Sequence, residues 1–223
     1  MNRRHFLAAP LLAAAAPAAV PQVDRWAVIT IGNLSRNRYW GEPDDKPLRD
    51  AICTCTLIAG SGFRLLVDPS LANGLDMVKE LDRRTGLKPG DIDAVFITHE
   101  HADHFAGLAH FPKAVWFAGA LVAEILNRGL AFARKVEAAP KTMFGAVEVL
   151  PTPGHTQSHH SLRFQCEGRW VVAAGDAVAT RDFWRERRSY YNAVDPALAA
   201  RTMDSLANLD SIIVPGHDNY FAV

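Results

Sequence analysis

The chain has 223 residues, of which 49% are hydrophobic and 22% are charged, and this suits one globular domain with a sizeable core. Basic and acidic residues both number 24, so the overall charge predicts no broad basic surface for nucleic acid or an anionic membrane. We therefore expect a small-molecule ligand and no nucleic-acid partner.

The N-terminus has the features of an export signal. The segment MNRRHFLAAPLLAAAAPAA combines two arginines with an apolar run and with small residues that suit cleavage near Ala18 or Ala19. Asn2–Leu7 resembles a twin-arginine signal. We expect residues 1–19 to be this signal and residues 24–223 to be the mature domain, periplasmic or secreted. An ordinary secretory signal or an uncleaved anchor is the alternative, although the run is too short and too rich in alanine and proline to span a bilayer comfortably.

Apolar runs and turn residues predict the elements of the N-terminal half. They are a strand at 26–33, a long loop at 34–50, a hairpin of residues 51–60 and 63–69, a helix at 71–84 and a strand at 94–98. The three cysteines are odd in number and lack zinc-finger spacing. Cys53 and Cys55, two apart in the first hairpin strand, are expected to share one face as small core residues, and Cys166 is also expected to pack.

The C-terminal half predicts a similar mixture of strands and helices. The expected elements are a strand at 114–117, a helix at 120–128, a strand at 146–150, a hairpin of 161–166 and 169–176, a helix at 197–209 and a last strand from Ser211. Glu167-Gly168 is the hairpin's turn signal. Strands that run into helices, with antiparallel hairpins between them, predict an α/β fold in which sheet packs on sheet with helices outside.

The segment Thr98–His104, with the sequence THEHADH, follows an apolar strand and holds four possible metal ligands. In an extended chain residues two apart point the same way, so His99 and His101 can reach one metal ion. Asp103 and His104, across the turn, can reach a second. A lone histidine here would more often be structural, but four nitrogen and oxygen ligands in this order indicate a metal site.

Three further candidate ligands each follow an apolar strand and a glycine. They are His155 in TPGHT, Asp176 in AAGD and His217 in VPGHD. Glycine lets the backbone turn sharply and bring the side chain towards a common centre. Each motif is weak alone, but their order along the chain strengthens the assignment.

The series HxHxDH, PGH, GD and PGH resembles the metallo-β-lactamase superfamily across essentially the whole mature chain. The resemblance implies the four-layer αβ/βα sandwich and a glyoxalase II-like or lactonase-like site for two metal ions. The implied ligands are His99, His101 and His155 for the first metal, Asp103, His104 and His217 for the second, and Asp176 as a bridge. Imidazoles and carboxylates without a thiolate suit two zinc ions, with manganese or iron left open.

The expected chemistry is hydrolysis by a hydroxide that bridges the two metals, since metal binding lowers the pKa of water to about 7. Asp103 is expected to orient this hydroxide and to carry a proton to the leaving group. Glu100 points away from the metals on strand alternation, so we expect it to support a ligand or to face solvent. His159 is expected to buttress a ligand loop, and His110 and His160 to pack or lie on the surface.

Departures from the family's branches narrow the substrate. Asp176 suits the glyoxalase II, lactonase and phosphodiesterase branches, whereas β-lactamases usually lack it. The chain ends six residues after His217, so we expect no helical glutathione-binding domain. Ala179 stands where quorum-signal lactonases carry a tyrosine. We expect a small ester, lactone, thioester or amide as substrate.

Other functions remain open from the sequence. The alternatives are a phosphodiesterase, a β-lactamase and a metal-bearing module without activity. A further one is a mononuclear iron dioxygenase like the persulfide-oxidising relatives, held by His99, His101 and His155 or Asp176.

Two segments are candidates for substrate contact. Arg36–Pro43 contains Tyr39 and Trp40, and Phe183–Tyr191 contains Trp184, Arg185 and Arg187. The aromatic side chains could contact an apolar group and the arginines a carboxylate. Core packing and a solvated charged face are the alternative, weighted equally.

Overall fold

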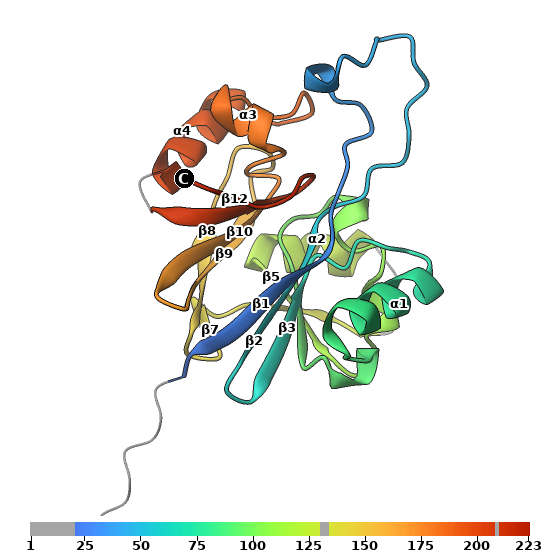
Figure 1. Ribbon diagram of the computed structural model, residues 1–223, viewed down its shortest axis with the longest axis vertical. Coiled ribbons are helices and arrows are strands. Elements are labelled where there is room, and N and C mark those ends of the chain that lie inside the picture. The colour runs from blue at the N-terminus through green and yellow to red at the C-terminus, as the bar shows by residue number, and fades with distance from the viewer. Residues whose placement is uncertain (1–20, 130–133, 208–209) are drawn as a thin grey trace, which may run out of the picture.

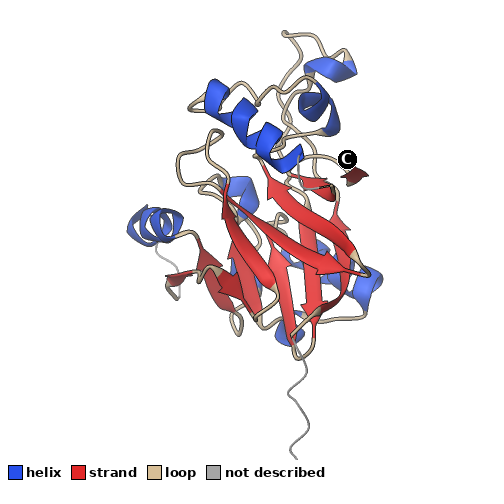
Figure 2. Cartoon of the chain, turned by 90° about the vertical axis from the view of Figure 1, so that its left-hand side faces the viewer, coloured by secondary structure: helices blue, strands red, loops and turns tan. Residues whose placement is uncertain are grey.

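The computed structural model describes residues 21–129, 134–207 and 210–223. The expected export signal at residues 1–19 lies outside these residues, as does the end of the helix expected at 197–209. Two six-stranded sheets pack face to face with helices on their outer sides (Figure 1 and Figure 2). This arrangement confirms the expected α/β sandwich of four layers.

The first sheet keeps its strands in chain order. Its first three strands run antiparallel and the remaining ones run parallel. The fourth strand is buried along its whole length, as expected for a parallel strand that is covered on both faces. The strands are β1 (Val23–Thr30), β2 (Cys55–Gly60), β3 (Phe63–Val67), β4 (Ala94–Ile97), β5 (Val115–Ala118) and β6 (Val136–Ala138).

The second sheet has the order β12-β11-β10-β9-β8-β7. The predicted hairpin of β9 and β10 turns at Glu167 and Gly168, whose φ angles of 51° and 77° are those that a tight hairpin turn requires. The strands are β7 (Thr142–Met143), β8 (Val147–Pro151), β9 (His160–Cys166), β10 (Arg169–Gly175), β11 (Ser211–Pro215) and β12 (Phe221–Ala222).

Side chains from the inner faces of both sheets form the central core. Leu65 on β3 and Phe96 on β4 meet Phe164 on β9 and Val171 on β10, and all four are fully buried. Burial of apolar surface contributes about 25 cal/mol per Å² and holds the sheets together. The core thereby fixes the relative positions of the strand ends.

Helices cover the outer face of each sheet. α1 (Gly74–Thr85) and α2 (Ala120–Gly129) pack on the first sheet, and α3 (Arg181–Arg185) and α4 (Pro196–Ala207) pack on the second. Short 3-10 turns are η1 (Arg38–Trp40), η2 (Pro89–Asp91), η3 (Ala102–His104) and η4 (Leu108–His110). Among the helices of the described residues, none has the length and apolarity needed to cross a membrane.

Residues 51–54 differ from the prediction, because β2 begins only at Cys55. Ile52 forms a single bridge with Asn33, and the N–H of Thr54 donates to the carbonyl of Gly216 in the other sheet. Cys53 therefore lies before the strand, and both cysteines are fully buried, as expected for core residues. Cys55 packs below the helices of the first sheet, whereas the thiol of Cys53 donates to the carbonyl of Asp68 at 3.4 Å.

Two leucines on α1 test this packing. Leu81 is fully buried and Leu75 is 70% exposed. Leu81→Ala is expected to lower the free energy of unfolding by about 2–5 kcal/mol, because it deletes buried methyl groups and leaves a cavity. Leu75→Ala is the matched control and should change it by less than about 0.5 kcal/mol. Urea unfolding followed by circular dichroism measures both, and equal losses would contradict the described packing of α1.

Candidate metal centre

The candidate ligands lie where four strands end at one edge of the sandwich. β4 leads into Thr98–His104, and β8, β10 and β11 lead into the loops that carry the three other candidates. These three strands run the same way, because β8 and β10 are both antiparallel to β9 and β11 is parallel to β10. At this edge the N–H of His160 donates to the carbonyl of Thr98 at 3.0 Å and joins the two sheets. The fold thus brings together ligands that are far apart in the sequence.

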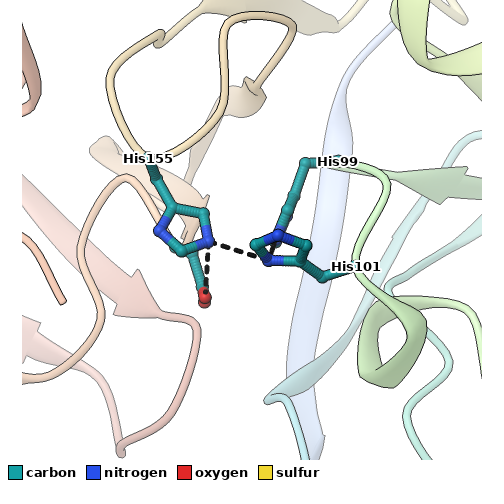
Figure 3. A group of neighbouring side chains, drawn as sticks. His99, His101 and His155 are labelled. Atoms are coloured by element: carbon teal, nitrogen blue, oxygen red, sulfur yellow. Dashed lines mark hydrogen bonds and ion pairs between the residues drawn. The ribbon is translucent and has the colours of Figure 1, made fainter. Parts of the chain in front are cut away.

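The first group contains His99, His101, His155 and Asp176, which each offer a ligand atom within 4.8 Å of the others. Nδ1 of His101 lies 2.9 Å from Nε2 of His99 and 3.0 Å from Nε2 of His155. Nε2 of His155 lies 3.2 Å from Oδ2 of Asp176. Figure 3 shows His99 and His101 on one side, facing His155. Imidazole nitrogens and a carboxylate that point at one centre could hold a metal ion.

The second group contains Asp103, His104 and His217. Nε2 of His217 lies 3.5 Å from Oδ2 of Asp103. Oδ1 of Asp176 lies 3.1 Å from Nε2 of His217 and 3.3 Å from Nε2 of His104. Asp176 therefore faces the first group with one carboxylate oxygen and the second group with the other.

Burial and the neighbouring charges set the charge of these groups, and the pKa values of His104 and His217 are raised in spite of burial, with Asp176 contributing to both shifts. Burial lowers the pKa of His99 well below its usual value and takes that of His155 to about 4. Both imidazoles are therefore neutral at pH 7, which is the form that binds metal. Burial opposes the charge of Asp176, but the imidazoles of His217, His104 and His155 hold the pKa of this carboxyl well below its usual range. The carboxylate is therefore ionised and able to act as a ligand.

The orphaned polar atoms at the centre also fit a metal ion. Nε2 of His104 and Oδ1 of Asp176 are fully buried, and neither has a partner with hydrogen-bonding geometry within the described part of the chain. Buried polar atoms without a partner are costly and call for an explanation. A metal ion that accepts both atoms as ligands accounts for them.

Asp68 positions His104 and was missed by the sequence reasoning. Its Oδ2 accepts hydrogen bonds from Nδ1 of His104 at 2.8 Å and from Oγ1 of Thr98 at 2.7 Å, and its Oδ1 accepts from the N–H of Thr98. This holds Nδ1 of His104 at Asp68 and directs Nε2 towards Asp176, where a metal could be bound. Asp68 has φ of 49°, a region that aspartate tolerates better than most residues. The sequence signal was an acidic residue at the end of the apolar run FRLLV, just before a proline.

A third group of possible ligands, Cys53, Asp68 and His104, shares His104 with the second group. Burial raises the pKa of the Cys53 thiol to about 12, so the free thiol is protonated at pH 7. Both oxygens of Asp68 already accept hydrogen bonds from Thr98 or His104. This group supports His104 from behind.

His217 is fixed in a similar way. Its Nδ1 donates to the carbonyls of Asn33 at 3.1 Å and Ile52 at 3.0 Å, which directs Nε2 towards Asp176. The preceding residue, Gly216, packs against Oδ1 of Asp176 so closely that a Cβ there would overlap it. Gly216 was predicted to let the chain turn and bring His217 to the centre. The structure shows that a glycine is needed here because Asp176 leaves no room for a side chain.

The supporting residues largely lie as predicted. Oε2 of Glu100 accepts from Oγ of Ser158 at 2.9 Å and from Oγ1 of Thr156 at 3.3 Å, so Glu100 ties the HxHxDH segment to the loop of His155. Nδ1 of His159 is 2.8 Å from Oγ1 of Thr152, and the N–H of Ala177 donates to its Nε2. The rings of His110 and His160 contact backbone carbonyls of Ala72 and Ser158.

Some side chains of the two candidate substrate segments line a cavity, and others are buried in the core. Tyr39 packs edge-on against Phe183, with ring centroids 4.9 Å apart, and Phe183 belongs to a cluster with Tyr190. Trp184 does not join them, because it is buried among the side chains of α4 and β10. Arg185 and Arg187 line a separate cavity with Phe221, and Arg187, which also lines a hollow with Tyr190 and Tyr191, pairs with Asp204.

Asp68→Asn tests the support of His104. The amide keeps the size of the side chain but replaces one acceptor oxygen with a donor, so we expect metal affinity to fall about 10–100-fold. Asp82→Asn, at an exposed position on α1, is the matched control. Competition with a chromogenic chelator measures both variants. Unchanged affinity in Asp68→Asn would mean that this hydrogen bond does not support the site.

Comparisons with known proteins give the family. Residues 48–217 match the model of the metallo-beta-lactamase superfamily. The chain is 29% identical over 168 residues to metallo-beta-lactamase domain-containing protein 1 of Rattus norvegicus, a match that covers 71% of this chain and 63% of the rat protein. It is 34% identical over 124 residues to a hydroxyacylglutathione hydrolase of Xanthomonas axonopodis pv. citri, covering 55% of this chain and 44% of that protein. The chain thus spans less than two thirds of either relative.

Its fold resembles that of a B. thuringiensis protein with N-decanoyl-L-homoserine bound at the active site. The TM-score is 0.66 with 21% identity, over 88% of this chain and 94% of that chain. Since the family model matches most of the chain and the fold agrees, this protein belongs to the metallo-β-lactamase superfamily.

Proposed function

We propose that this protein is a dinuclear metallo-hydrolase that cleaves a small ester, lactone or thioester. The observation that carries the proposal is the position of Asp176, a buried carboxylate with one oxygen towards each of two ligand groups. A closed structural site would need one such group. Two groups that share a carboxylate are typical of sites that hold a pair of metals for hydrolysis.

The proposed metals are two zinc ions, with manganese or iron as the other options. His99, His101 and His155 would hold the first, Asp103, His104 and His217 would hold the second, and Asp176 would contribute to both. When bound, the pair supplies Lewis acidity and a water acidic enough to yield hydroxide near neutral pH.

Asp103 is the proposed proton carrier. Among the two acidic ligands it is the more exposed, with 20% of its side chain accessible against 5% for Asp176. A carboxylate at the rim of the site can orient a water molecule and pass a proton to the leaving group, whereas Asp176 is enclosed by imidazoles. This difference in exposure supports separate roles for the two aspartates.

The substrate class rests on the relatives and on charge. One relative is named a hydroxyacylglutathione hydrolase, which supports a thioester or ester, and the B. thuringiensis structure holds an acyl homoserine, which supports a lactone. The equal numbers of basic and acidic residues argue against a polyanionic substrate. Ala179, whose carbonyl accepts from the N–H of His217, stands where quorum-signal lactonases carry a tyrosine, so a different lactone or ester is favoured.

Metal content and Asp103→Asn test this proposal together. The mature protein should contain about two metals per chain by elemental analysis and should lose activity with a chelator. Asp103→Asn should lower kcat at least about 100-fold, since general acid–base catalysis contributes typically 10²–10⁴-fold. Asp82→Asn should leave kcat unchanged. Circular dichroism should report the same fold for both variants.

The outcomes separate the alternatives. One iron per chain would instead support a mononuclear dioxygenase. Cleavage of phosphodiesters but of no carbonyl substrate, in a panel of lactones, thioesters, β-lactams and phosphodiesters, would overturn the proposed substrate class. An unchanged rate in Asp103→Asn would remove its role as proton carrier.

We also propose that the protein is exported through the twin-arginine signal at residues 1–19. A fusion of residues 1–30 to a reporter should reach the periplasm, and Arg3→Lys with Arg4→Lys should block this, because that pathway reads the arginine pair. Cell fractionation measures the reporter. Continued export of the double variant would mean that the signal is an ordinary secretory one.

A further inference from the structure

A cavity of about 420 Å³ lies between the β1–β2 loop and the segment that follows α3. In Figure 1 this loop rises beyond the sheets beside α3. The apolar part of the lining is formed by Leu48, Phe183, Tyr190 and Tyr191. The charged part is formed by Arg36 and Asp44, which pair with each other at 3.9 Å, and by Arg38. Its volume falls within the range of small-ligand sites.

Backbone contacts connect the cavity walls to the metal centre on two sides. Leu34 packs with Phe183 and Tyr190, and the carbonyl of the residue before it accepts from Nδ1 of His217. On the other side, the N–H of Val194, three residues after Tyr191, donates to the carbonyl of His155 at 3.0 Å. A ligand in the cavity therefore lies next to the loops that carry two of the candidate metal ligands.

The wall formed by the β1–β2 loop is held in place by polar contacts. The hydroxyl of Tyr190 donates to the carbonyl of Arg36 at 2.8 Å. Within the loop, the carboxylate of Glu42 accepts hydrogen bonds from Arg49, from Lys46 and from the N–H of Asn37. The hydrogen bond from Arg49 is the main reason that the pKa of Glu42 falls to about 2. Its charge is committed to these partners.

One arginine of the cavity lining and one arginine of an adjoining hollow have no such partner. Arg38 lines both this cavity and a second hollow of about 230 Å³, which Arg188 also lines, and the two hollows share Tyr190 and Tyr191. Within the described part of the chain, neither Arg38 nor Arg188 forms an ion pair or a side-chain hydrogen bond. Arg187, by contrast, pairs with Asp204.

We propose that Arg38 and Arg188 bind the carboxylate of an anionic acyl substrate whose apolar part lies against Phe183 and Tyr191. The inference rests on the proposed hydrolase function and specifies its substrate as an ester or lactone with a free carboxylate remote from the scissile bond. Guanidinium groups suit this role because they hold carboxylates with paired hydrogen bonds. A single carboxylate matches the two free cations, whereas a polyanion would need a wider basic surface.

Two esters that differ only in a terminal carboxylate test the proposal. These are 4-nitrophenyl hexanoate and the mono-4-nitrophenyl ester of hexanedioic acid, supplied to the metal-loaded mature protein. We expect KM to be lower for the carboxylated ester. Arg38→Gln with Arg188→Gln should raise that KM about 10-fold, leave its kcat unchanged and leave hexanoate hydrolysis unchanged. Arg185→Gln, at an exposed position on α3 that lines a different cavity, is the matched control.

Equal KM values for the two esters in the wild type, or an equal rise for both esters in the double variant, would overturn the proposal. If neither ester is hydrolysed, the proposed hydrolase function is wrong. The carboxylate site can then still be tested by measuring ligand binding. Isothermal titration calorimetry measures the Kd of the monoanilide of hexanedioic acid and that of hexananilide. The proposal requires Kd about 10-fold lower for the carboxylated anilide, and it requires the double variant to abolish this difference.

Discussion

The buried carboxylate of Asp176 constrains the rest of this structure. Removing an ionised carboxylate from water costs several kcal/mol unless opposite charge and hydrogen bonds compensate. Here Nε2 atoms of His104, His155 and His217 lie 3.1 to 3.3 Å from its two oxygens, and these histidines follow three different strands in the two sheets. The sheets must therefore close over this residue in one arrangement. A metal that binds only this arrangement would stabilise the folded state by mass action, so metal loading would be coupled to folding.

The layers behind the ligands preserve this arrangement. Asp68, the residue directly after β3, holds His104 through its Nδ1. Two carbonyls of the β1–β2 loop hold His217 through its Nδ1. Both contacts leave Nε2 directed at Asp176. The same loop forms one wall of the cavity beside the site. A displacement of the loop would therefore disturb both the cavity wall and the orientation of His217.

The parts of the site that could be predicted are those whose signal is local in sequence. The four ligands His99, His101, Asp103 and His104 lie within six residues of sequence. The strand and the glycine before Asp176 predict a turn there. Asp68 could not be assigned in this way, because its partner His104 lies 36 residues away and only the parallel pairing of β3 with β4 brings them together. For the same reason the sequence could not decide whether Trp184 lies in a pocket or in the core, and it did not predict the five-residue helix α3. Strands of two or three residues, such as β7 and β12, carry too little pattern to be seen.

Global and local charge lead to different conclusions about the ligand. The balance of 24 basic and 24 acidic residues argues against a polyanion, but it does not describe any one surface. Charges at the protein surface act over about 8 Å at physiological ionic strength, so a ligand at the cavity senses mainly the groups beside it. The acidic Glu42 is held by Arg49 and Lys46, whereas Arg38 and Arg188 lack an ion-pair partner in the described part of the chain. A near-neutral overall charge is thus compatible with a local site that selects a single carboxylate.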